Sequence, residues 1–247
     1  MIKLIGIPFD GNSSFLKGPA LAPPRIRLMD TDGSANSFCE NGKAVINGQT
    51  YIDLGDLIFP DINPLAVYTT IKQKIEKELT QGDKIICLGG DHSVSFPIIE
   101  AHAAKYNNLN VLHLDAHADL YDNFDNNPFS HASPFARLME KGIVQSLTQV
   151  GIRTLNTHQK EQANKFGVRV IEMKDFNYDF INSIIDICKV MYENHKFFYR
   201  VIYTHLSDDE YNEKNFRNAD LSMARESALN FLARLIILSS LKPYLSR

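Results

Sequence analysis

The sequence is poor in cysteine and has no long block of like charge. Its three cysteines, Cys39, Cys87 and Cys188, show no C-x-x-C spacing. So sparse and odd a set predicts free thiols in a reducing compartment, and we expect a cytoplasmic protein. Cys87 lies in an apolar run and is expected to be a small core residue. The formal net charge of −3 gives no basic footprint, which argues against nucleic-acid binding.

The sequence also lacks an apolar run long enough to cross a membrane. The most apolar stretch, residues 228–238, is interrupted by Asn230 and Arg234 and is shorter than the ~20 residues that a membrane span needs. The N-terminal apolar run meets Pro8 and Asp10 too soon for a secretory signal. With 44% hydrophobic and 22% charged residues, the composition predicts a soluble globular protein without a membrane partner.

Short apolar runs alternate with amphipathic stretches, a pattern that predicts βα units around a mostly parallel sheet. No repeat or linker divides the chain, so residues 1–247 are expected to form one domain. Residues 11–50 are rich in Gly, Pro, Asn and Ser and are expected to form surface loops. The expected strands are residues 3–7, 84–88, 109–114, 147–152, 168–173 and 197–203. The expected helices are residues 65–79, 95–106, 133–141, 178–192 and 219–238.

The first motif with chemical content is Gly89-Gly-Asp-His-Ser93, directly after an expected strand. Ligands gather at the carboxyl ends of parallel strands, so His92 stands where a site is expected to form. A single histidine after a strand is more often a hydrogen-bonded structural residue than a ligand.

The second motif, Asp115-Ala-His-Ala-Asp119, also follows an expected strand. In an extended segment residues i, i+2 and i+4 project to the same side, so Asp115, His117 and Asp119 are expected to converge. The alternative is a polar loop whose aspartates accept hydrogen bonds from backbone N–H groups. That alternative leaves unexplained both His117 in the middle of the motif and His92 at the end of another expected strand, so the two motifs together predict a metal site.

Carboxylate and imidazole ligands without thiolate favour Mn²⁺, with Fe, Co or Zn as further possibilities. Two carboxylates and two imidazoles suffice for one ion, and a second ion needs more oxygen ligands. Asp91, Asp122 and Asp125 are either partners of the ligands or ordinary loop carboxylates, and the sequence leaves both open.

A third segment, Ser130-His-Ala-Ser-Pro-Phe135, leads into an expected helix. Ser130 or Ser133 can cap that helix, with Pro134 at its first position. His131 follows the metal motif by a dozen residues, where it is either a proton shuttle at the mouth of the site or a structural histidine.

These three segments resemble signature segments of the ureohydrolases, the arginase and agmatinase family, in order and in register. Segments 6–10, 53–56 and 151–153 are similar to the agmatinase branch in particular, and the resemblance covers roughly residues 1 to 175. It implies a three-layer α/β/α fold with a central sheet and a binuclear manganese site. It also implies that a metal-activated hydroxide attacks a guanidinium carbon, releasing urea and an amine, while His131 passes a proton to the leaving amine.

The sequence departs from the family after Asp175, where no Asp-x-Asp occurs. In the family, two aspartates of that motif complete both metal sites, so the C-terminal part is expected to be shortened and the second site to be incomplete. Glu210, in Glu210-Tyr-Asn, is similar to the glutamate that binds the substrate guanidinium, although Glu213 replaces a proline. Asp208 and Glu210 have the spacing of replacement ligands, at the cost of that role for Glu210.

The leading hypothesis is therefore metal-dependent hydrolysis of a linear, agmatine-like guanidino compound. The alternative is a degenerate ureohydrolase that keeps the fold and one ion without turnover. A metal-dependent deacetylase on the related fold is disfavoured by the segments around His92 and His131. Relatives of the agmatinase type imply a homo-oligomer, a trimer or a hexamer.

Overall fold

The apolar runs of the sequence form parallel strands in the computed structural model, which describes residues 1–14, 16–31, 36–39, 42–79, 84–175 and 198–202. Strands and helices alternate along the chain from β1 to β6. Within the described ranges the strands form two sheets, ordered β2-β1-β3 and β6-β5-β4-β7, in which every pairing is parallel. The expected α/β class is confirmed.

The first sheet carries the N-terminus on its central strand. It consists of β1 (Ile2–Gly6), β2 (Tyr51–Asp56) and β3 (Lys84–Leu88), and β1 pairs with both of the others. The chain leaves β1 and β3 at the same edge, because Gly6 stands opposite Leu88. The loops that follow these two strands therefore start beside each other.

The second sheet consists of β4 (Asn110–Leu114), β5 (Ser146–Ile152), β6 (Arg169–Glu172) and β7 (Phe198–Ile202). Its central strand β4 pairs with β5 on one side and with β7 on the other. The register places His113 opposite Gln149 and Leu114 opposite Ile202. Asp115 follows β4 at the carboxyl edge of this sheet.

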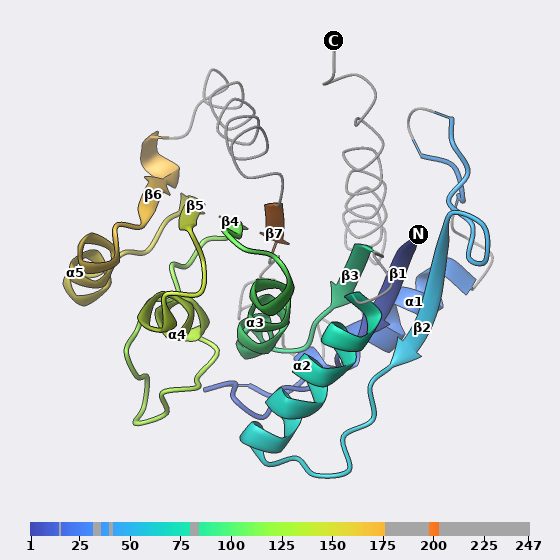
Figure 1. The fold of residues 1–247 in the computed structure, drawn as a ribbon, viewed down its shortest axis with the longest axis horizontal. Helices are drawn as coiled ribbons and strands as arrows, with labels where there is room; N and C mark the ends of the chain where they lie inside the picture. The colour runs from blue at the N-terminus through green and yellow to red at the C-terminus, as the bar shows by residue number, and fades with distance from the viewer. Residues whose placement is uncertain (15, 32–35, 40–41, 80–83, 176–197, 203–247) are drawn as a thin grey trace.

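The helices are α1 (Ala22–Thr31), α2 (Pro64–Leu79), α3 (Ser95–Lys105), α4 (Pro134–Lys141) and α5 (Thr157–Phe166). Short 3-10 turns precede α1 and α3 and follow β6. In Figure 1, α2, α3 and α4 form a row, and α3 packs against both neighbours.

One apolar core joins α2, α3, α4 and α5 to both sheets. In α2, Val67, Ile71 and Ile75 recur at helical spacing and are fully buried, so one face of the helix packs inward. Fully buried members from other elements are Ile5, Ile99, Val111, Phe135 and Ile152.

A buried ion pair fastens α2 to β1. Lys3 Nζ donates to Glu78 Oε2 at 2.7 Å, and both side chains are 8% exposed. Lys74 also pairs with Glu78, at 2.8 Å. Hydrogen bonds from Lys3 and then Lys74 hold the pKa of Glu78 below its usual value.

Three expectations about the elements need correction. Residues 11–50 are not all loop, because α1 and a 3-10 turn (Pro19–Leu21) lie there. Strand β2 and helix α5 were not expected either. Asn156 caps α5 by accepting from Gln159 N–H, and Gly167 ends it in the left-handed conformation, so capping compensates for a weak apolar face. The other described elements match expectation to within about two residues.

The expected helices 178–192 and 219–238 lie outside the described residues, as do Cys188, Asp208 and Glu210. In the described part of the chain, no helix has both the length and the apolar character required to span a membrane.

Candidate metal centre

His92 is positioned by a tight approach between the loops that follow β1 and β3. Asp91 N–H donates to the Phe9 carbonyl at 2.8 Å, and a Cβ at Gly90 would lie 1.8 Å from that same oxygen. Only glycine fits there without displacing backbone. The chain then enters a 3-10 turn, His92–Val94, which holds the His92 side chain at 2% exposure.

Asp91 is the cap of this turn. Its carboxylate accepts hydrogen bonds from Ser93 N–H at 3.0 Å, from Ser93 Oγ, and from Asn12 N–H at 2.9 Å. Burial raises the pKa of Asp91, and these hydrogen bonds oppose the rise. Asp91 thus stabilises the turn that carries His92.

Asp115 and Asp119 reach the same place from the loop after β4. The backbone bends at 115–116 and does not continue as a strand, and Asp119 has a positive φ of 48°. The Asp119 carbonyl accepts from Phe135 N–H at 3.3 Å, which ties this loop to the start of α4. The carboxylates therefore converge through a loop and not through strand alternation.

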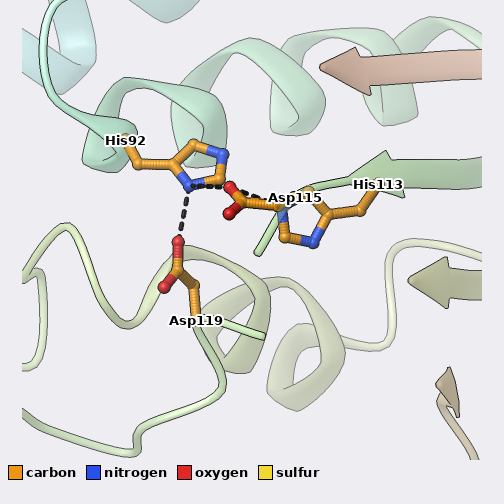
Figure 2. Close-up of side chains that lie close together, drawn as sticks. All are labelled: His92, His113, Asp115 and Asp119. Atoms are coloured by element: carbon orange, nitrogen blue, oxygen red, sulfur yellow. Dashed lines mark hydrogen bonds and ion pairs between the residues drawn. The ribbon is translucent and has the colours of Figure 1, made fainter. Parts of the chain in front are cut away.

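Figure 2 shows the resulting cluster. His92 Nδ1 lies 2.5 Å from Asp119 Oδ2 and 3.5 Å from Asp115 Oδ2. One nitrogen or oxygen from each of His92, His113, Asp115 and Asp119 lies within 4.8 Å of the others, and all four residues are buried. Sequence motifs 27 residues apart are thereby brought into contact.

His117 stands at the edge of the cluster. Its Nδ1 is 3.6 Å from Asp115 Oδ1, and its side chain is 34% exposed. Its backbone N–H donates to Asp115 Oδ1 at 2.8 Å, and the hydrogen bond to Asp115 raises the pKa of the ring. The structure thus places His117 beside Asp115, but not in the four-residue group.

His113 is the member that the sequence did not single out. It lies within β4, inside an apolar run, where a histidine reads as a core residue. Its Nε2 is 3.2 Å from Asp115 Oδ2, and its ring packs on Phe135 with centroids 4.0 Å apart. The available signal was its place two residues before Asp115, which puts both on one side of an extended segment.

Burial and neighbouring charges act in opposite directions on the pKa values of the cluster residues. Burial by itself lowers the pKa of His92, but the hydrogen bond to Asp119 and the nearby carboxylates outweigh it and raise that pKa. Burial raises the pKa of Asp115, but hydrogen bonds from His113 and His117 bring it well below its usual range. Burial lowers the pKa of His113, which keeps that ring neutral.

The donor set fits a divalent cation. His92, Asp115 and Asp119 supply one imidazole and two carboxylates in a buried cluster, a combination that suits Mn²⁺, Fe²⁺ or Zn²⁺ and contains no thiolate. Two buried carboxylates this close to each other are costly unless cations offset them. Asp122 and Asp125 are exposed and do not belong to this group.

His131 lies on a network centred on Asn12. Its N–H and Nδ1 lie 3.3 and 3.1 Å from the Asn12 carbonyl. The buried Asn12 side chain donates to Tyr68 Oη at 2.9 Å and accepts from Asn127 Nδ2 at 3.2 Å. His131 is half-buried and is not in the four-residue group, so its predicted non-ligand role stays a prediction.

A hollow of about 210 Å³ is lined in part by Asn12 and Ser14, which both contact His131. Drug-sized ligands occupy roughly 300–1,000 Å³, so this hollow suits a small polar molecule. It is lined by Gly11, Asn12, Ser13, Ser14, Phe124, Asp125, Asn127 and Ser130.

Known proteins of one family resemble this chain. The arginase family model matches residues 1–201. "Arginase 1, mitochondrial" of Arabidopsis thaliana is 42% identical over 184 residues, which cover 72% of this chain and 54% of that protein. An N(1)-aminopropylagmatine ureohydrolase of Thermus thermophilus is 43% identical over 169 residues, 68% of this chain and 56% of that protein.

A solved structure agrees with these sequence matches. The arginase from Medicago truncatula superposes with a TM-score of 0.66 at 38% identity, over 70% of this chain and 57% of that one. This confirms the expected arginase-like α/β fold. The chain spans about half the length of the curated relatives it matches. The family model, the relatives and the fold agree: the chain belongs to the arginase family.

Proposed function

We propose that this chain binds a divalent cation through His92, Asp115 and Asp119 and hydrolyses a linear guanidino compound to urea and an amine. The observation that carries the proposal is the buried cluster of two carboxylates and an imidazole, formed from two motifs of an arginase-family chain. When bound, a divalent cation supplies a Lewis acid that makes water nucleophilic at neutral pH. We propose Mn²⁺ as that cation.

His131 has the setting of a proton carrier. One ring nitrogen, Nδ1, lies 3.1 Å from the Asn12 carbonyl and 3.3 Å from Ser14 N. The other nitrogen, Nε2, would take up a proton released by the attacking water and pass it to the leaving amine. The hollow beside it provides a place for the substrate chain.

The lining of that hollow favours a cationic substrate. It contains the carboxylate of Asp125 and several hydroxyl and amide groups, and none of its eight residues is Lys or Arg. An amine such as that of agmatine is attracted there, whereas a carboxylate such as that of arginine meets a like charge. We therefore propose an agmatine-like substrate, with arginine as the alternative, because arginases are among the relatives.

A second candidate is an arginase-family protein that holds one ion and does not turn over. The supporting observation is the sequence after Asp175, which contains no Asp-x-Asp. In the family pattern two aspartates of that motif complete both metal sites. With fewer carboxylates, two neighbouring dications repel each other with little to offset the repulsion. The intact motifs then support one ion per chain and weak or absent urea production.

The experiment combines elemental analysis with urea release. The purified full chain is incubated with excess Mn²⁺, and urea is measured from agmatine and from arginine. His92→Asn tests the cluster, and His102→Asn is its control, since His102 is also buried but hydrogen-bonds to Ile98 O in α3. We expect one equivalent of manganese, lost in His92→Asn alone, and more urea from agmatine than from arginine.

The remaining outcomes separate the candidates. One equivalent of metal without urea from either compound establishes the second candidate. Two equivalents with rapid turnover show that Asp208, Asp209 or Glu210 replaces the missing ligands. A chain that binds no divalent metal refutes both candidates.

A cytoplasmic location and a homo-oligomeric state, trimer or hexamer, belong to the same proposal. Burial raises the pKa of the Cys87 thiol to about 12, so this cysteine is an unreactive core residue. Light scattering of the purified chain measures the oligomeric state directly.

A further inference from the structure

We propose that His113 is a positioning residue: it is not a metal ligand, and it orients Asp115 through a proton that is fixed on Nε2. The proposal rests on the metal binding proposed above and does not depend on turnover. Figure 2 shows the His113 ring in the cluster, with Asp115 between it and His92.

The position of His113 is fixed by its surroundings. The residue is fully buried in β4, and Phe135 packs on its ring at an interplanar angle of 33°. Gln149 stands directly opposite in the register of β5 and is also fully buried. The ring therefore has a polar neighbour on each side, Gln149 at Nδ1 and Asp115 at Nε2.

Hydrogen-bond chemistry determines where the ring proton lies. Gln149 Nε2 is 2.6 Å from the Ala118 carbonyl oxygen, which can only accept, so the amide nitrogen and not the amide oxygen faces it. The same NH₂ group lies 3.0 Å from His113 Nδ1 and has a second hydrogen to donate. Nδ1 is then an acceptor without a proton, and a neutral ring carries its proton on Nε2.

This tautomer makes Nε2 a donor to Asp115. The Nε2–H group points to Asp115 Oδ2 at 3.2 Å, and a protonated ring nitrogen has no lone pair to offer a metal ion. The other oxygen, Asp115 Oδ1, accepts from His117 N–H at 2.8 Å. Hydrogen bonds thus hold both oxygens of the Asp115 carboxylate, so its orientation is fixed before a cation binds.

A hydrogen-bond donor to a ligating carboxylate, such as His113 to Asp115, affects how tightly the metal binds. Groups that hydrogen-bond to a metal-ligating side chain typically change metal affinity by 10–100-fold when they are removed. His113→Phe keeps a ring on Phe135 but has no N–H for Asp115. His113→Gln offers an amide N–H at about the reach of Nε2 and serves as the rescue variant. His102→Phe is the control for replacing a buried histidine that hydrogen-bonds within α3, to Ile98 O.

Two measurements test the proposal on the full chain. Manganese titration should show binding weakened about 10–100-fold in His113→Phe, restored to within about threefold in His113→Gln, and unchanged in His102→Phe. Nitrogen-15 spectra of the metal-free, histidine-labelled wild type, assigned by the signal missing in His113→Phe, should show a proton on Nε2 and none on Nδ1.

Three results overturn the proposal: a proton on Nδ1 of His113, unchanged manganese affinity in His113→Phe, or an equal loss in His113→Gln. If the wild-type chain binds no manganese, the proposed function fails, whereas the spectrum still decides the position of the proton. If His113→Phe does not fold, His113→Gln and the wild-type spectrum carry the test.

Discussion

Replacement of Asp119 by asparagine separates the structural role of its carboxylate from its role toward a cation. In the metal-free protein, Asp119 Oδ2 accepts from His92 Nδ1 at 2.5 Å, a charge-assisted contact in a buried site. Such bonds contribute ~1.5–3 kcal/mol, against ~0.5–1.5 kcal/mol for neutral ones. The asparagine side chain keeps the shape and a carbonyl acceptor, so we expect Asp119→Asn to lose about 1 kcal/mol, or ~2–4 °C in Tm for a chain of this size.

In the presence of manganese, the difference in Tm between the wild type and Asp119→Asn should be larger. At a cation concentration of 100 times Kd, binding to the folded state stabilises the wild type by ~2.7 kcal/mol. At ~2–4 °C per kcal/mol, this raises its Tm by about 5–11 °C. Asp119→Asn lacks one of two carboxylates in the cluster and should show little or none of this increase.

Differential scanning calorimetry with and without Mn²⁺ measures both effects. Asp122→Asn is the matched control, because Asp122 lies three residues away in the same loop and its side chain is 53% exposed beside His158. This control should keep the full manganese shift. If Asp119→Asn also keeps it, Asp119 is not a ligand and the reasoning from the cluster is wrong.

Three further predictions follow from other contacts. Lys3→Met should lower the free energy of unfolding, measured by urea titration, by ~2–3 kcal/mol, because it breaks the buried Lys3–Glu78 pair and leaves Glu78 only Lys74. Adding Glu78→Gln to Lys3→Met should restore part of the lost stability, because it removes the buried carboxylate. The difference in unfolding free energy between the wild type and Lys3→Met should shrink as the pH falls below 4.5 and passes the lowered pKa of Glu78. Protonation of Glu78 then removes the ion pair from the wild type as well. Gly90→Ala should weaken manganese binding at least tenfold by pushing Phe9 away. His131→Asn should lower urea release ~10²–10⁴-fold and leave the manganese content unchanged; loss of metal would make His131 a ligand.

The sequence predicted those elements whose apolar residues dominate. Apolar residues make up most of β3 and β4, β5 buries Leu147, Val150 and Ile152, and α2 has helical spacing, so local patterns identified these elements. Strand β2 is partly exposed and includes Asp53, Gly55 and Asp56. In the structure Arg27 of α1 binds Asp53 and Asp56, so a long-range ion pair stabilises what local propensity does not.

Three of the four residues of the cluster were predicted from the sequence, whereas the predicted His117 lies beside the cluster and His113 was not predicted. Motif chemistry identified His92, Asp115 and Asp119, which the structure brings together. Apart from its place two residues before Asp115, nothing in the sequence separated His113 from core residues, because its role depends on Gln149 in the neighbouring strand, 36 positions away. A register between strands is a tertiary property that a single strand does not encode.

The Asn12 network also constrains the time at which the site can form. Asn12 contacts His131, which is 119 residues further along the chain. At a synthesis rate of ~5–20 residues per second, the loop after β1 waits about 6–24 s on the ribosome before that partner exists. Early in this interval β1 has neither β3 nor α2 beside it, and its apolar residues are open to chaperones and to wrong pairing. Synonymous codon changes that slow translation between residues 14 and 131 should therefore lower the yield of metal-binding protein, although they alter no contact of the finished molecule.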